Sequence, residues 1–403
     1  MTLAGIGLAY LRARPLATAL NLALLALGVG TITVLLLATT QLEERMGRDA
    51  RGIDLVAGAK GSPMQLVLSA VFHVDAPTGN IALADAKALA AHPAVKRAIP
   101  IALGDSYRGF RIVGTNHDYP AHYGARIAEG RLWTEPMEMV LGAEVAARTR
   151  LSPGAAFVGV HGLEGEGDEH ASAPNRVVGV LAPGGTVLDR LILTGVETVW
   201  AVHQHGEPGD DPKKLVAAMD EEEKELTALL IQYRSPLAAA TLPRQINAKS
   251  ALQAASPAYE SARLFSMIGV GVDVLRAFGL VLVLAAGLSV FIALLNALEE
   301  RRYDLAVMRM LGASRAKLVG LLLLEGVALA AAGGILGIAL GHLLTEALGM
   351  ALSAAKQTPV TGWAWNAQEL WLFLLALAVG IVAALIPAWR AYRSDVAPVL
   401  AEG

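Results

Sequence analysis

The sequence predicts an α-helical membrane protein with four transmembrane helices and a large mixed α/β extracytoplasmic domain inserted between the first and the second. Of its 403 residues, 54% are hydrophobic and only 5% aromatic, so the apolar excess is aliphatic, as in lipid-facing helices. Charged residues make up 17%, against roughly 25% in a soluble domain. This composition excludes a disordered chain and argues against an ordinary soluble enzyme.

Four stretches are long enough to cross a bilayer, which takes about 20 apolar residues. The first (residues 16–42) and the second (residues 277–298) contain no charged residue, and the third is interrupted only by Glu325 and His342. The predicted spans are residues 16–42, residues 264–298 (the end of a stalk and the second span proper), residues 318–344 and residues 370–389. A cleaved signal peptide is disfavoured for the first, because its apolar run is much longer than the roughly 7–15 residues of a signal peptide's apolar h-region.

The arginines and lysines beside these spans predict the orientation, since cytoplasmic loops are enriched in both. Arg12 and Arg14 precede the first span, and residues 299–317 carry five such cations, whereas residues 345–369 carry only Lys356. We therefore expect a bacterial inner-membrane protein with both termini inside. The predicted cytoplasmic segments are 1–15, 299–317 and 390–403, and the predicted extracytoplasmic ones are 43–263 and 345–369.

The extracytoplasmic domain should alternate strands and helices. Apolar, β-branched runs predict strands at 95–103, 110–115, 137–141, 156–160, 177–181 and 196–202. Helical patterns cover 83–91, 142–150 and 187–193, a charged helix is predicted over 211–232, and a helix broken near Pro257 over 242–276. The last of these would be a stalk that leads into the second span.

Residues 299–317 predict a short amphipathic helix on the cytoplasmic surface. Leu305, Met308 and Leu311 recur at every third position, Gly312 is placed to end the helix in a left-handed cap, and Ser314 can cap the next. Two interpretations are open. The helix could rest on lipid headgroups, or it could dock a cytoplasmic partner through its apolar residues.

Four sequence motifs point to a family. They are E-R-R-Y-D-L-A-V-M-R-M-L-G-A-S-R at 300–315, L-L-L-L-E-G at 321–326, G-G-I-L-G-I-A-L-G at 333–341 and A-A-L-I-P-A-W-R-A at 383–391. Over about residues 265–400 the chain resembles the FtsX-like permease domain of MacB-type bacterial ABC transport systems. The chain differs from the residues usual in the family at Tyr303, Asp304 and Trp389, and these differences cast little doubt on the resemblance.

The resemblance implies a permease that carries no substrate through its bundle. ATP-driven closure of paired ATPase subunits would move the extracytoplasmic domain and so export or extract a substrate. The residues implied in coupling to the ATPase are Glu300, Arg301, Arg302, Asp304, Leu305, Met308, Leu311 and Gly312. The implied partners are a separate cytoplasmic ATPase that holds ATP and Mg²⁺, a second permease copy in a homodimer, membrane lipid, and a periplasmic adaptor or binding protein. The alternative is a regulatory mechanotransmitter that switches an extracytoplasmic partner, such as a cell-wall hydrolase, without transport.

Gly333, Gly337 and Gly341 recur every four residues in the third span. Such a face of small residues lets helices approach closely. It could serve packing within one subunit or a dimer interface.

No catalytic motif is present, so the chain is not expected to be an enzyme. A P-loop requires G-x-x-x-x-G-K-[ST], and the stretch Gly58–Ser62 has the wrong spacing. ATP hydrolysis, and the cofactors for it, are therefore expected on another chain. The net charge of −3 gives no sign of a nucleic-acid partner, and the absence of cysteine removes disulfides and thiolate chemistry.

Four histidines lie in loops rich in glycine and acidic residues: His161, His170, His203 and His205. Imidazole with carboxylate suits zinc or a similar divalent ion, so these loops are candidates for weak metal binding. Glycine-rich spacing argues against a preformed site, and incidental histidines in solvated loops are the alternative.

Overall fold

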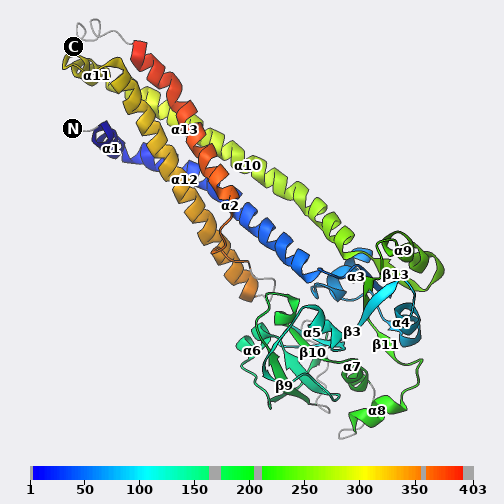
Figure 1. The fold of residues 1–403 in the computed structure, drawn as a ribbon. Coiled ribbons are helices and arrows are strands. Elements are labelled where there is room, and N and C mark those ends of the chain that lie inside the picture. Colours follow the sequence, from blue (N-terminus) through cyan, green and yellow to red (C-terminus); the bar gives the residue numbers. More distant parts are fainter. Residues whose placement is uncertain (1–2, 163–173, 204–210, 355–359, 394–403) are drawn as a thin grey trace. The chain divides into compact units, whose positions relative to one another are not determined.

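The computed structural model describes residues 3–162, 174–203, 211–354 and 360–393, which fold as two compact units. The first, here called the helical unit, consists of Met1–Leu42 and Met267–Gly403. The second, the α/β unit, is Glu43–Ser266. Figure 1 shows the elements of both units along the chain.

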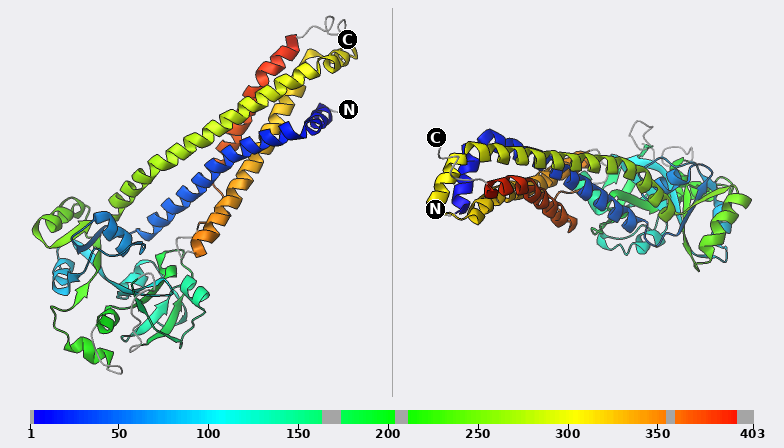
Figure 2. Two further views of the ribbon diagram at one scale, coloured as in Figure 1. Left: turned by 180° about the vertical axis from the view of Figure 1, so that it is seen from behind. Right: turned by 90° about the horizontal axis from the view of Figure 1, so that it is seen from above.

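The helical unit is built on four long apolar helices. Each is long and apolar enough to cross a membrane, which confirms the four apolar helices expected from the sequence. They are α2 (Pro15–Asp49), α10 (Pro257–Glu300), α12 (Arg315–Ala354) and α13 (Gln368–Arg393); two short helices, α1 (Leu3–Ala13) and α11 (Arg302–Met310), accompany them. The long helices lie side by side in both views of the unit (Figures 1 and 2).

Small residues allow close packing in this bundle. Gly326 of α12 and Gly380 of α13 face each other so closely that a Cβ on either would lie within about 3 Å of the other's backbone oxygen. Ala286, Ala330 and Ala376 from three different helices are completely or almost completely buried in one cluster. Lipid offers helices no hydrophobic gain on association, so tight contacts between small residues must hold such a bundle together.

The α/β unit is formed around a mixed sheet whose strand order is β13-β1-β12-β3-β4-β10-β6-β9-β5 in the described residues. Most neighbouring strands are antiparallel, and the β10–β4 and β6–β9 pairs are parallel. The bounds are β1 (Leu55–Ala59), β3 (Val95–Tyr107), β4 (Phe110–Thr115), β5 (Ile127–Gly130), β6 (Glu138–Leu141), β9 (Asn175–Leu181), β10 (Leu191–Gly195), β12 (Ala228–Tyr233) and β13 (Leu252–Ala255). Two short strands join this sheet, β7 (Ala156–Phe157) on β9 and β8 (Val160–His161) on β3, while β2 (Ile81–Ala82) pairs with β11 (Glu225–Leu226).

Helices cover the sheet around two separate cores. One core lies among β1, β3, β12 and β13, and the other among β4, β6, β9 and β10. Strand β3 belongs to both halves of the sheet, because its first part pairs with β12 and its second part with β4. The β3–β4 pairing has a register shift between Leu103 and Ser106. The helices are α3 (Pro63–Ala70), α4 (Leu83–Ala90), α5 (Asp118–His122), α6 (Ala143–Thr149), α7 (Val196–His203), α8 (Pro212–Ala218), α9 (Ala238–Lys249) and the 3₁₀ turn Val187–Arg190.

The structure corrects several sequence predictions in this unit. The charged helix over 211–232 is wrong: only α8 is helical, and Ala228–Tyr233 forms β12 between β1 and β3. Its apolar residues happen to recur at helical spacing, but pairing with two distant strands decides the outcome. The helix over 187–193 is a 3₁₀ turn followed by β10, and the strand over 156–160 is replaced by β7 and β8.

Two further corrections concern helix and strand boundaries. The strand predicted over 196–202 is helix α7, because Val196, Val199 and Trp200 fall on one helical face and pack on the first core. The helix over 242–276 is interrupted by β13, which pairs with β1. Strand β1 itself was missed, because its glycine and alanines resemble a turn sequence.

Candidate functional site

The connection between α10 and α12 is helix α11, closed by tight turns. Gly312 follows it with a φ of +94°, the left-handed conformation that favours glycine, as the sequence predicts. The Ala313 N–H donates to the Met308 carbonyl at 3.0 Å, and the Ser314 hydroxyl accepts from the Lys317 N–H at 3.4 Å. These local bonds fix α11 between its two long neighbours.

One face of α11 is anchored in the bundle. Leu305 is buried in a cluster drawn from α10, α12 and α13, and Met308 packs against the same cluster. The other cluster members are Leu298, Leu318, Leu322, Ala388 and Ala391. Leu305 and Met308 therefore attach α11 to three long helices at once.

The end of α11 exposes apolar side chains. Leu311 is 83% exposed and Met310 is 68% exposed, and Tyr303 is exposed nearer the start of the helix. The sequence placed Leu305, Met308 and Leu311 on a common face. The structure separates them, because the helix ends at Met310 and the turn carries Leu311 away from the cluster that holds the other two.

A buried ion pair fixes the start of α11. Arg301 Nη1 lies 3.0 Å and 3.3 Å from the two carboxylate oxygens of Glu325, whose side chain is 2% exposed. The guanidinium carbon of Arg301 also lies 3.5 Å from the centre of the Tyr10 ring, a cation–π contact with α1. A carboxylate in an apolar span requires such a partner, so Glu325 ties α12 to the α11 connection and α1.

The other charged residues of this connection are at the surface. Glu300 forms an ion pair with Arg14, which precedes α2, and Arg302 lies 3.4 Å from Glu299 with both side chains more than half exposed. Exposed pairs contribute only about 0–1 kcal/mol. Asp304 is also exposed, so charged side chains lie at the start of α11, whereas the apolar side chains of Met310 and Leu311 are exposed at its end.

The three glycines of the third span face α2 of the same chain. A Cβ on Gly333, Gly337 or Gly341 would lie 2.5–2.8 Å from a side-chain atom of Leu25, Val29 or Thr33, respectively. Only hydrogen fits at these positions. The structure therefore places these residues in packing within one subunit.

A polar cluster joins the other end of α12 to α13. His342 Nε2 lies 2.9 Å from Glu369 Oε2, and its Nδ1 contacts the Gly362 carbonyl. Glu346 accepts the Thr361 hydroxyl at 2.9 Å and the Gly362 N–H at 2.8 Å. These contacts close the α12–α13 connection. His342, Glu346 and Glu369 each have a polar partner in this cluster.

The candidate metal residues are only partly described. His161 Nδ1 lies 3.4 Å from Asp105 Oδ1, whereas His170 and His205 lie outside the described residues, and His203 is described only as the last residue of α7. In the ranges that the structure describes, no three His, Cys, Asp or Glu side chains are grouped to hold a metal ion. Metal binding by these loops stays a prediction.

A buried hydrogen-bonded pair occurs in the α/β unit. His73 Nε2 lies 2.9 Å from the Tyr119 hydroxyl, and both side chains are buried. Burial lowers the pKa of His73 well below 6.5, and the nearby positive charge of Arg111 lowers it further. His73 is therefore neutral at physiological pH.

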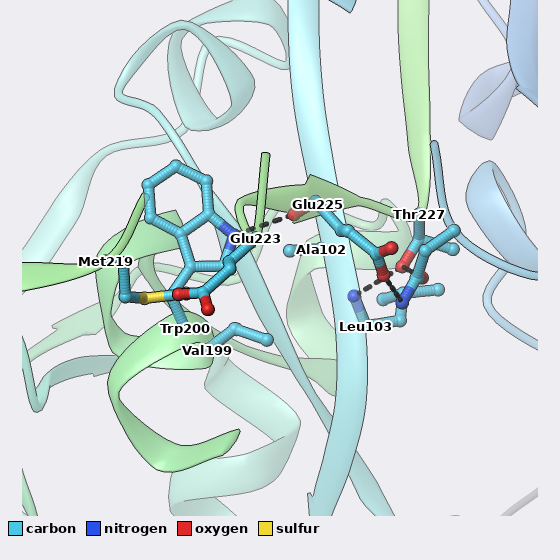
Figure 3. Close-up of a pocket in the computed structure, with 9 residues that line it drawn as sticks. Ala102, Leu103, Val199, Trp200, Met219, Glu223, Glu225 and Thr227 are labelled. Atoms are coloured by element: carbon cyan, nitrogen blue, oxygen red, sulfur yellow. Dashed lines mark hydrogen bonds between the residues drawn. The ribbon is translucent and has the colours of Figure 1, made fainter. Parts of the chain in front are cut away.

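Two cavities lie next to each other in the same unit. One, of about 260 Å³, is lined by the Trp200 indole, Met219 and the side chains of Glu223 and Glu225, with the indole N–H donating to the Glu225 carbonyl at 2.7 Å (Figure 3). The other, of about 380 Å³, is lined by Arg111 and shares Asn80 and Leu103 with the first. Sequence patterns gave no sign of either.

Comparisons with known proteins identify the two parts of the chain. Residues 18–249 match the MacB-like periplasmic core domain, and residues 276–396 match the FtsX-like permease C-terminal domain. The pyoverdine export ATP-binding/permease protein PvdT of Pseudomonas putida (strain KT2440) is 24% identical over 399 residues. That alignment covers 94% of this chain but 56% of PvdT, so the chain spans little more than half the length of that relative.

Two solved structures are also similar. The periplasmic region of MacB from Actinobacillus actinomycetemcomitans is 13% identical with a TM-score of 0.35, covering 56% of this chain and 97% of that one. The extracellular domain of the noncanonic ABC-type transporter YknZ from Gram-positive bacteria is 15% identical with a TM-score of 0.30, covering 50% of this chain and 98% of that one. The MacB-like match alone covers more than half of the sequence and adjoins the FtsX-like match. The chain belongs to the MacB-type, FtsX-like permease family of ABC transporters.

Proposed function

We propose that this chain is the permease subunit of an ABC transport system in the bacterial inner membrane. It couples ATP hydrolysis by a separate cytoplasmic ATPase to movement of an extracytoplasmic α/β unit, which exports or extracts a substrate. Membership of the permease family supports a partner ATPase. The word "export" in the name of the P. putida relative favours transport over purely regulatory action.

The observation that carries this proposal is the two-sided environment of α11. Its inner face is packed on α10, α12 and α13, while Met310 and Leu311 are exposed at its end and the charged residues Arg302 and Asp304 at its start. Exposed apolar residues with charged neighbours are typical of a docking surface. A partner that pushes on Leu311 would thus move helices that are firmly attached to α11.

Continuous helices supply the route for that movement. Helix α10 runs without a break from Pro257, in the α/β unit, to Glu300, and only Arg301 lies between it and the start of α11. Helix α2 likewise contains residues of both units. Neither helix is interrupted by a loop where it passes from one unit to the other, which supports coupling between α11 and the α/β unit.

The proposed topology places residues 43–263 outside the membrane, between the first and second spans. Residues 1–15, 299–317 and 390–403 are cytoplasmic, and 345–369 faces outside, as the arginine and lysine distribution favours. The proposed assembly contains two copies of this chain and an ATPase pair, with a periplasmic adaptor or binding protein as a further partner.

Docking is tested by co-purification with the ATPase. Leu311→Asp puts a charge on the proposed contact, so the complex should be lost while the isolated permease keeps its melting temperature. Trp363→Asp is the matched control, because Trp363 is equally exposed, at 87%, but lies in the segment proposed to face outside. Docking through Leu311 would be refuted if both variants retained the ATPase equally.

Topology is tested by thiol labelling of intact cells, which the absence of cysteine makes clean. A membrane-impermeant maleimide should label Trp363→Cys and spare Leu311→Cys until the membrane is opened. Labelling of Leu311→Cys in intact cells would contradict the proposed orientation.

A further inference from the structure

Arg111 is a buried cation in the middle of the α/β unit. It is the second residue of β4, a strand with six buried residues, and its register partners are Leu191 on β10 and Ser106 on β3. Its exposed fraction is 6%. Arginine is rarely so deeply buried unless an acidic side chain pairs with it.

The guanidinium of Arg111 is only partly satisfied. Within the described part of the chain its one acceptor is the Asp75 backbone carbonyl, its Nε–H has no acceptor, and no carboxylate lies at ion-pair distance. The Asp75 carboxylate accepts the Ala76 N–H at 2.7 Å instead. Burial lowers the pKa of Arg111 to about 10, against the opposing effect of the Asp75 charge, so the side chain remains cationic at neutral pH.

This cation borders an open volume. Arg111 lines the cavity of about 380 Å³ together with Asp105, His161, Gly79 and Gly104. That volume lies within the range of small-molecule sites. The neighbouring cavity in Figure 3 is lined by Glu223 and Glu225 and by no arginine or lysine of the described residues, so an anion is better accommodated beside Arg111, where one cation faces the single carboxylate of Asp105.

We infer that the Arg111 cavity binds a carboxylate group of a small molecule or of a peptide terminus. A guanidinium presents parallel N–H donors that match the two oxygens of a carboxylate. The Asp105 carboxylate in the same wall disfavours a second negative charge, so a carboxylate is preferred to a phosphate dianion. The inference concerns the α/β unit alone and is independent of the proposed coupling to an ATPase.

The test uses the full chain in detergent, without ATPase, and follows thermal unfolding by tryptophan fluorescence. The probes are acetate and N-acetyl-dialanine at constant ionic strength, compared with N-acetyl-dialanine amide and phosphate. A rise in melting temperature with acetate assigns a small-molecule site, and a rise with the peptide alone assigns a peptide terminus. No rise with either carboxylate, or an equal rise with the amide or phosphate, overturns the inference.

Two variants separate binding from folding. Arg111→Lys keeps the charge but not the planar fork, and should weaken carboxylate binding by roughly 10- to 100-fold. Arg111→Met should abolish binding without lowering the melting temperature of the ligand-free protein, since it removes a buried charge that has no carboxylate partner in the ranges the structure describes. The control Arg176→Gln removes an exposed cation of the same unit and should bind normally. Wild-type binding by Arg111→Lys would show that the guanidinium only supports the fold.

Discussion

Removal of the Arg301 side chain should destabilise the helical unit by about 3–5 kcal/mol. In Arg301→Ala, the Glu325 carboxylate would lose both of its contacts, at 3.0 Å and 3.3 Å, while remaining 98% buried within an apolar span. The variant also loses the contact with the Tyr10 ring, which contributes about 0.5–2 kcal/mol. The larger part of the cost is the unpaired buried charge.

A double-mutant cycle of Arg301→Met, Glu325→Leu and their combination distinguishes this charge effect from simple loss of packing. Glu325→Leu alone should cost a similar amount, because it leaves Arg301 without its partner. Arg301→Met combined with Glu325→Leu should lie within about 2 kcal/mol of wild type, since apolar residues of similar volume replace the pair. Arg302→Ala is the control, because its exposed pair with Glu299 contributes at most about 1 kcal/mol.

The assay is reversible unfolding of the purified permease in mixed micelles with increasing sodium dodecyl sulfate, followed by far-UV circular dichroism. The reasoning is refuted if Arg301→Ala costs less than about 1 kcal/mol, or if the double variant costs the sum of the single ones.

Three further predictions concern packing and pH. Gly337→Ala should cost about 1–3 kcal/mol in the same unfolding assay, because its Cβ would meet Val29 at 2.6 Å, whereas Gly320→Ala, where nothing lies within 4 Å, should be neutral or slightly stabilising. The pKa of His73 is lower in the folded chain than its usual 6.5, so its contribution to stability is complete above pH 6.5 and declines as the pH falls below that value. The melting temperature of His73→Asn should lack this decline, and a pH profile unchanged from wild type would contradict the prediction. The hydrogen bond from Arg131 lowers the pKa of Glu138 from 4.5 to about 2, so stability should fall as the pH drops through that window, and Glu138→Gln should lose that slope in acid titrations followed by fluorescence.

The sequence allowed prediction of the features that depend on local chemistry. Prediction of the four apolar stretches requires only hydropathy, and prediction of the left-handed cap at Gly312 requires only its place after an amphipathic run. Contacts between distant residues were not predictable. A carboxylate such as Glu325 in an apolar span needs a polar partner, but no local pattern identifies Arg301 as that partner. The ring of Tyr10 lies on α1, far from both residues along the chain.

The α/β unit shows the same limit in its strands. Ala228–Tyr233 has apolar residues that suit a helix or a buried strand, and its pairing with β1 and β3 decides between them. Arg111 stands in the run Phe110–Thr115, which correctly predicts a strand. That no acidic side chain of the described residues pairs with this arginine becomes visible only when the surrounding side chains are placed.

The proposed function requires that ATP hydrolysis by an ATPase docked on α11 moves the α/β unit. Its most direct test is a distance measurement by pulsed electron paramagnetic resonance between nitroxides at Arg176→Cys and Gln368→Cys, in the complex with the ATPase. The account predicts a distance distribution that changes between the nucleotide-free and the ATP-trapped complex, and a reduced change when Leu311→Asp weakens docking. An identical distribution in both nucleotide states would contradict it.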